Sequence, residues 1–125
     1  WFDNATPSGN AVLLHALSGL YALTGDGRYE AALQSTLPAY TDYAQKVAAG
    51  VAHALEAATT HAAGVAVIKV RAGVSLEPLQ TALASAPWRR VFIQVVAEQS
   101  ADYQVCIGTR CLPPVDSIPK MVGDL

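Results

Sequence analysis

Two short apolar runs in the second half of the chain predict buried β-strands. They span residues 64–70 and 91–97, and both are rich in β-branched residues and too short for helices of ordinary length. Between them three leucines recur at helical spacing, with Ser75 placed to cap the first turn. The order strand, helix, strand predicts one parallel crossover unit.

A polar loop at the start of the chain leads into the first predicted helix. Thr6 is the expected N-cap with Pro7 at the first helical position, and Ser8 is the alternative cap. Gly25 can adopt the left-handed conformation that ends a helix. Asp26 follows it directly, so a second helix should pack against the first as an antiparallel hairpin.

The second helix leads into an alanine-rich helical stretch whose internal boundaries are open. Pro38 should kink or end the second helix, because proline cannot donate a backbone hydrogen bond. Gly50 is the expected break, and helical spacing continues to about Thr59.

The segment after the second strand predicts a third strand at residues 103–107. Residues 98–102 are too few for a parallel crossover, so this strand should return antiparallel as a hairpin. Asp116 or Ser117 can then cap a short terminal helix that ends near Val122.

These elements predict an α/β fold, with α+β as the alternative class. A helical hairpin and a further helix should pack on a small three-stranded βαβ-β sheet that is followed by a short C-terminal helix. We expect residues 1–125 to form a single domain, with a helical subregion at 1–60 and a βαββ subregion at 64–125.

The composition leaves little polar material to cover the surface. Of the 125 residues 52% are hydrophobic and 14% are charged, against about a quarter charged in a typical domain. We therefore expect that the chain associates or has lost a covering domain, and the start at Trp1 without an initiator Met favours a piece of a larger protein. The apolar face that its missing neighbours would cover should make this piece a homo-oligomer. A net charge of −2 without a basic cluster predicts neither nucleic-acid nor membrane partners, and we expect a cytoplasmic protein.

The loop at the start of the first helix is the best candidate for a ligand site. It offers a carboxylate, amides, hydroxyls and free backbone donors at a helix N-terminus, although helix capping alone also explains its hydroxyl residues. A histidine one turn into the helix could face whatever the loop lines. The candidate ligand-binding residues are Asp3, Asn4, Ser8, Asn10 and His15. No residue has a spacing that predicts catalysis, and no metal or other cofactor is expected.

Cys106 and Cys111 are the only cysteines of the chain. Two reduced thiols in or near the core are the expected state in the cytoplasm. A short disulfide is the first alternative, because the two residues lie close in sequence. Metal binding or redox work is the second alternative, although zinc needs about four ligands and redox motifs have two intervening residues.

Both ends of the chain resemble a known family. Residues 3–10 (DNATPSGN), followed by residues 23–26 (LTGD) and Tyr29, look like the C-terminal part of the thioredoxin-domain proteins related to spermatogenesis-associated protein 20. Residues 103–106 (YQVC) and 111–115 (CLPPV) are similar to the closing cysteine and proline motif of that family. Together the motifs bracket nearly the whole chain.

The resemblance implies a parent protein with an N-terminal thioredoxin-like domain before a helical toroid of the six-hairpin glycosidase kind. It implies that Asp3, Asn4, Ser8 and Asn10 face the central cavity of that toroid. This chain lacks the Cys-x-x-Cys domain of the family, and its segment between the second and third strands is shorter than the family pattern.

Three functions follow as expectations. The first is a non-catalytic C-terminal piece whose partners are the missing N-terminal domains of the same parent protein. The second is a portion that contributes to the pocket of a carbohydrate-active isomerase or hydrolase. The third is a small cysteine-based redox or metal module.

Overall fold

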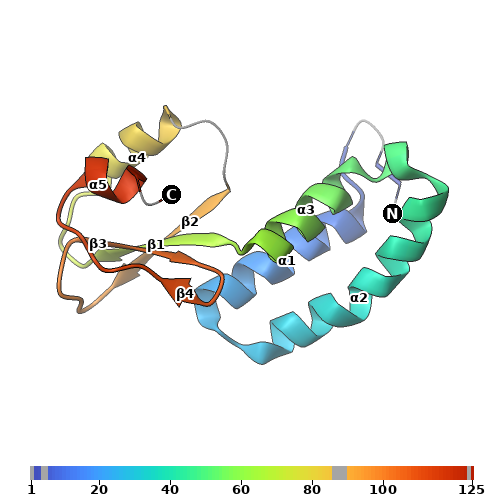
Figure 1. Ribbon diagram of the computed structural model, residues 1–125, viewed down its shortest axis with the longest axis horizontal. Helices are drawn as coiled ribbons and strands as arrows, with labels where there is room; N and C mark the ends of the chain where they lie inside the picture. The colour runs from blue at the N-terminus through green and yellow to red at the C-terminus, as the bar shows by residue number, and fades with distance from the viewer. Residues whose placement is uncertain (1, 4–5, 86–89, 124) are drawn as a thin grey trace. The chain divides into compact units, whose positions relative to one another are not determined.

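The computed structural model describes residues 2–3, 6–85, 90–123 and 125. The chain divides into two compact units, Trp1–Gly64 and Val65–Leu125. The described residues form five α-helices and a four-stranded mixed sheet, which confirms an α/β or α+β fold (Figure 1). The division falls close to the boundary between the two expected subregions, and their folding as a single domain stays a prediction.

The secondary structure described for the first unit is helical, as its apolar spacing predicts. Helix α1 spans Gly9–Thr24 and helix α2 spans Gly27–Lys46, and they form the expected helical hairpin. A short 3₁₀ turn, η1 (Ala48–Gly50), leads into helix α3 (Ala52–Ala63). The interior of this unit is formed by seven buried residues, Ala11, Leu14, Leu33, Tyr40, Val51, Ala54 and Ala57.

The ends of α1 follow from local hydrogen bonding. Ser8 has extended backbone angles and its hydroxyl accepts the N–H of Ala11, so Ser8 is the N-cap, and the expectation of Thr6 in that role is wrong. Gly25 ends the helix with a φ of 67°, a left-handed conformation that costs glycine little, as expected. Asp26 then caps α2 by accepting the N–H of Arg28.

Helix α2 is longer than the sequence suggests because Pro38 does not end it. Pro38 lies inside the helix at an exposed position, where the missing donor removes one backbone hydrogen bond without burying an unpaired group. The break occurs instead at Val47 and η1, close to the expected Gly50. Helix α3 extends to Ala63, a few residues past the expected end at Thr59.

The second unit is built on the predicted crossover. Strands β1 (Ala66–Arg71) and β2 (Val91–Val96) are parallel and are connected through helix α4 (Glu77–Ala84), which confirms the strand, helix, strand reading. Ser75 does not cap α4: Leu76 occupies the cap position, and no side chain hydrogen-bonds there. The first turn of α4 is instead favoured by a proline at its start.

The third strand has a different neighbour from the one expected. Strand β3 (Tyr103–Ile107) is antiparallel, but it pairs with β1 rather than forming a hairpin with β2, and the sheet order is β2-β1-β3-β4. A connection of six residues is long enough to cross the end of one strand, because strands are about 4.8 Å apart. The crossing places β1, whose residues are mostly buried, between β2 and β3.

A fourth strand was not predicted. Strand β4 (Arg110–Cys111) pairs with β3 across the tight turn at residues 108–109. Helix α5 (Ile118–Gly123) follows, and Met121 within it is fully buried. Helices α4 and α5 cover the same face of the sheet (Figure 1). Leu79 of α4 and Met121 of α5 pack there in one cluster with Ile68.

Candidate functional site

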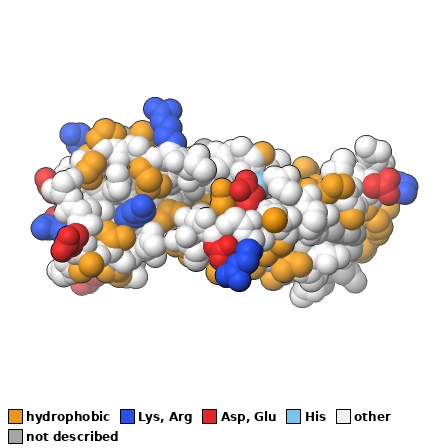
Figure 2. Space-filling model, turned by 90° about the horizontal axis from the view of Figure 1, so that it is seen from below, with side chains coloured by type: hydrophobic (Ala, Val, Ile, Leu, Met, Phe, Trp, Pro, Cys, Tyr) orange, Lys and Arg blue, Asp and Glu red, His pale blue; other side chains and the backbone are white. Residues whose placement is uncertain are grey.

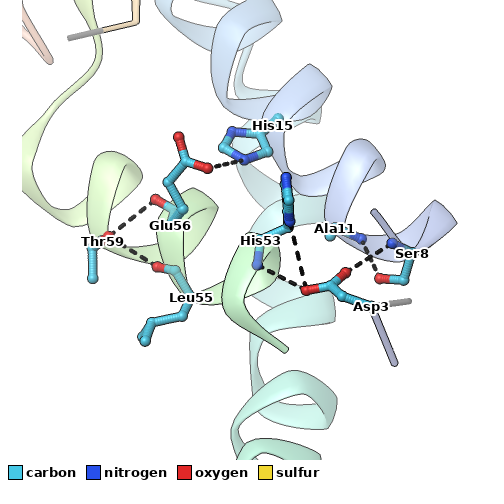
Figure 3. Close-up of polar contacts among 8 residues, drawn as sticks. All are labelled: Asp3, Ser8, Ala11, His15, His53, Leu55, Glu56 and Thr59. Carbon is cyan, nitrogen blue, oxygen red and sulfur yellow. Dashed lines mark hydrogen bonds and ion pairs between the residues drawn. The ribbon is translucent and has the colours of Figure 1, made fainter. Parts of the chain in front are cut away.

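Asp3 joins the N-terminal loop to the start of α3. Its Oδ1 accepts the backbone N–H of Ser8 at 2.8 Å, and its Oδ2 accepts the backbone N–H of His53 at 2.8 Å (Figure 3). The N–H of Asp3 itself donates to the carbonyl of Gly50 at 2.6 Å. The carboxylate therefore connects the starts of two helices, which lie far apart in the sequence.

The same hydrogen bonds set the charge state of Asp3. The N–H of Ser8 is the largest influence that lowers the pKa of Asp3 below its ordinary value of 3.8, and burial opposes it. The N–H and the nearby imidazole of His53 lower the pKa further, with Nδ1 of His53 at 3.9 Å from Oδ2. Asp3 is therefore ionised at neutral pH although its side chain is only 9% exposed.

The other loop residues do not converge on Asp3 in the same way. The hydroxyl of Ser8 accepts the N–H of Ala11 at 3.3 Å, so its oxygen serves as the helix cap. Asn10 is exposed in the first turn of α1. Asn4 lies outside the described residues. Of the predicted ligand residues, the structure thus brings together Asp3 and Ser8, and both take part in hydrogen bonds within the chain.

His15 is buried and faces a different partner. Its Nε2 lies 3.7 Å from Oε2 of Glu56, whose side chain is exposed on α3 (Figure 3). Figure 3 shows the imidazole of His15 turned toward Glu56, while the carboxylate of Asp3 meets His53. The polar contacts between α1, the N-terminal loop and α3 therefore form two groups.

His53 and Glu56 are the members of these groups that the sequence did not identify. They lie three residues apart on α3, a spacing that places them on neighbouring positions of one helix surface. This spacing was the only feature of the sequence that could have indicated that His53 and Glu56 lie near each other. It could not reveal their partners, because Asp3 is 50 residues from His53 in the sequence.

Cys106 and Cys111 form a disulfide, so the expectation of two reduced thiols is wrong. The physical reason is the unpredicted strand β4, which places Cys111 directly opposite Cys106 in the antiparallel ladder. Cys106 is buried and Cys111 is exposed. The two sulfurs are bonded to each other, so in this state neither cysteine has a thiolate that could bind a metal ion.

A hollow of about 240 Å³ in the second unit is lined by Ile107, Arg110 and Leu112. Two aliphatic side chains and a guanidinium offer no acid–base pair there. Within the described ranges, no group of three or more histidine, cysteine or acidic side chains is arranged to hold a metal ion. None of the helices described combines the length and the apolar character needed to cross a bilayer.

Comparisons with protein-family models, with curated proteins and with solved structures find no match for the chain.

Proposed function

We propose that this chain is a non-catalytic C-terminal portion of a thioredoxin-domain protein with a six-hairpin type of helical region. In this proposal the helical unit is one hairpin of a larger helical assembly, and its partners are the preceding domains of the same protein. The resemblance at residues 3–10 and 103–115 suggests the parent. The observation that supports a role as one part of a larger helical assembly is the exposed apolar face of α1.

Helix α1 has large apolar side chains on its outer face as well as on its inner face. Its inner face contributes Ala11 and Leu14 to the core, and both are fully buried. Its opposite face exposes large aliphatic side chains, with Val12 53%, Leu13 46% and Leu20 40% exposed. No Asp, Glu, Lys or Arg occurs between Gly9 and Thr24, and the histidine of this helix, His15, is buried.

A helix with this composition is typical of a protein interior. Surface helices of globular domains have a polar face opposite the apolar one, and here that face is absent from α1. Leu13, Ala16 and Leu20 recur at spacings of three and four residues, which is the pattern that packs into the grooves of another helix. Another helix of the parent protein is therefore the proposed neighbour of this face.

The engagement of Asp3 and Ser8 supports the non-catalytic reading. The carboxylate accepts two backbone N–H groups and the hydroxyl caps α1, so both side chains have a structural use that needs no substrate. A pocket role for Asn10 in a carbohydrate-active parent remains the alternative. It rests on the resemblance and on the exposure of that amide.

Cytoplasmic residence is also part of the proposal, and the disulfide is the observation that opposes it. Disulfides are uncommon in cytoplasmic proteins, which are kept reduced by thiol systems. Alkylation of the protein in intact cells before lysis tests the point: free Cys106 and Cys111 support cytoplasmic residence, and an intact disulfide argues against it.

The architectural proposal is tested by comparing stabilities in two contexts. The pair Leu13→Gln and Leu20→Gln should change the unfolding free energy of this chain by less than about 0.5 kcal/mol per site, because both side chains are exposed. In the full-length protein that the resemblance implies, the same pair should cost about 2 kcal/mol or more per site. Leu14→Ala is the control, and it should cost about 2–5 kcal/mol in both. Equal small effects of the glutamine pair in both contexts would refute the proposal.

A further inference from the structure

Strand β2 lies at one edge of the sheet and lacks the features that usually protect an edge. In the order β2-β1-β3-β4 its only described neighbour is β1 (Figure 1). Its sequence, VFIQVV, contains neither a charge nor a proline, and Val95 is 56% exposed. Natural proteins place lysines, prolines or bulges on such edges to prevent pairing with other strands.

The hydrogen bonding of β2 shows which backbone groups are directed away from β1. The carbonyl of Val96 accepts the N–H of Ala72 on the β1 side at 2.8 Å. Backbone groups alternate along a strand, so Phe92 and Gln94 also direct their N–H and C=O groups toward β1. The groups of Val91, Ile93 and Val95 are then directed toward the open edge.

We propose that β2 pairs antiparallel with β2 of a second copy of this chain, so that two four-stranded sheets join into one across a two-fold axis. The charges that flank the strand favour this occupant and this direction. Arg90 precedes β2 and Glu98 follows it, and both are exposed. Antiparallel pairing places opposite charges together at both ends of the strand, whereas parallel pairing would place Arg90 beside Arg90 and Glu98 beside Glu98.

The alternation of the ladder also selects the register. Residues with outward backbone groups must face each other, so odd-numbered residues of β2 pair with odd-numbered residues of the second copy. One register that satisfies this rule pairs Ile93 with the partner's Val95 and places Gln94 on the two-fold axis. The same register brings Arg90 next to the partner's Glu98, and by symmetry it does so twice.

A charge-swap cycle tests this pairing in solution. Arg90→Glu alone and Glu98→Arg alone should each weaken dimerisation about fivefold, measured by sedimentation equilibrium at low salt. The double variant should restore the original dissociation constant. Both residues are exposed, so these variants leave the core unchanged. Association through the outer face of α1 would be insensitive to all three variants. A monomeric wild-type chain, or a double variant as weak as the single ones, would overturn the proposal.

Cross-linking tests the position of the two-fold axis. Gln94→Cys should form a covalent dimer under mild oxidation, because position 94 faces itself across the axis at a closely spaced pair. Val95→Cys is the control, since the partner residue at that position is an isoleucine, and it should cross-link much more slowly. Equal cross-linking of both variants, or of neither, would contradict the register. A β2 edge that pairs with a different polypeptide would give neither a dimer nor a cross-link.

Discussion

The carboxylate of Asp3 accepts the backbone N–H of His53 at 2.8 Å, although 50 residues separate them in the sequence. The same carboxylate accepts the N–H of Ser8 at the start of α1. One side chain therefore satisfies donors at the starts of both α1 and α3, which would otherwise be among the unpaired groups of the helix ends. The polar loop therefore connects the N-terminal ends of α1 and α3 through the side chain of Asp3.

The pH dependence of stability should report on Asp3. Its pKa is lower in the folded chain than the ordinary value of 3.8, so its contribution to stability is fully present above about pH 3.8. The contribution is lost as the pH falls through the folded pKa, because the protonated carboxyl cannot accept both N–H groups. Wild type should therefore exceed Asp3→Asn in stability at pH 7, and the difference should shrink toward pH 2. Urea unfolding at a series of pH values measures it, and a pH-independent difference would contradict the assignment.

The capping role of Ser8 gives a prediction with a built-in control. Ser8→Ala removes the oxygen that accepts the N–H of Ala11 and should cost about 1 kcal/mol of stability. Thr6 is exposed and its residue type is equally suited to capping, so Thr6→Ala is the matched control and should have an effect close to zero. Thermal unfolding of the two variants decides between the two caps; a larger loss for Thr6→Ala would reverse the assignment.

Replacement of Pro38 should stabilise the helical unit. The proline lies inside α2 without a backbone donor, and its side chain is exposed. Pro38→Ala supplies the missing N–H to the preceding turn and should raise the unfolding free energy by about 1–3 kcal/mol. Chemical denaturation monitored by helical circular dichroism measures the change. A loss of stability would mean that the proline ring has a packing role.

The disulfide should contribute to stability by restricting the unfolded chain. Cys106 and Cys111 are separated by five positions, and closing a loop of that size is worth about 2 kcal/mol in the chain-entropy description. Addition of a reductant should therefore lower the stability of wild type by about that amount. Cys111→Ser should begin at the lower value and should not respond to the reductant. A reductant effect of equal size on Cys111→Ser would assign the loss to another cause.

Periodicity was enough to predict most of the fold. The parallel pair β1 and β2 and the helical hairpin follow from apolar spacing, because each element buries one repeating face. The position of β3 could not be predicted in this way. Its alternation is satisfied equally beside β1 or beside β2, and the choice depends on which strand becomes central.

The candidate site was predicted in part, and the reasons differ from residue to residue. Asp3 and Ser8 were identified because polar side chains just before a helix usually either cap it or bind a ligand, and the structure shows that both accept backbone N–H groups. His53 was missed because its link to Asp3 is a tertiary contact through a backbone N–H, which any residue at that position could donate. The disulfide was only the alternative to two reduced thiols, because strand β4, which places the cysteines opposite each other, has only two residues, too few for a periodic pattern.

The outer face of α1 is the feature on which the proposed role depends, and its accessibility can be measured directly. Leu20→Cys should react with a maleimide as fast as the exposed control Gln34→Cys in this chain alone, since both native cysteines are in the disulfide. In the full-length protein that the resemblance implies, Leu20→Cys should react at least about tenfold more slowly while Gln34→Cys is unchanged. If Leu20→Cys reacts equally fast in both proteins, α1 has no helical neighbour on that face and the architectural role is wrong.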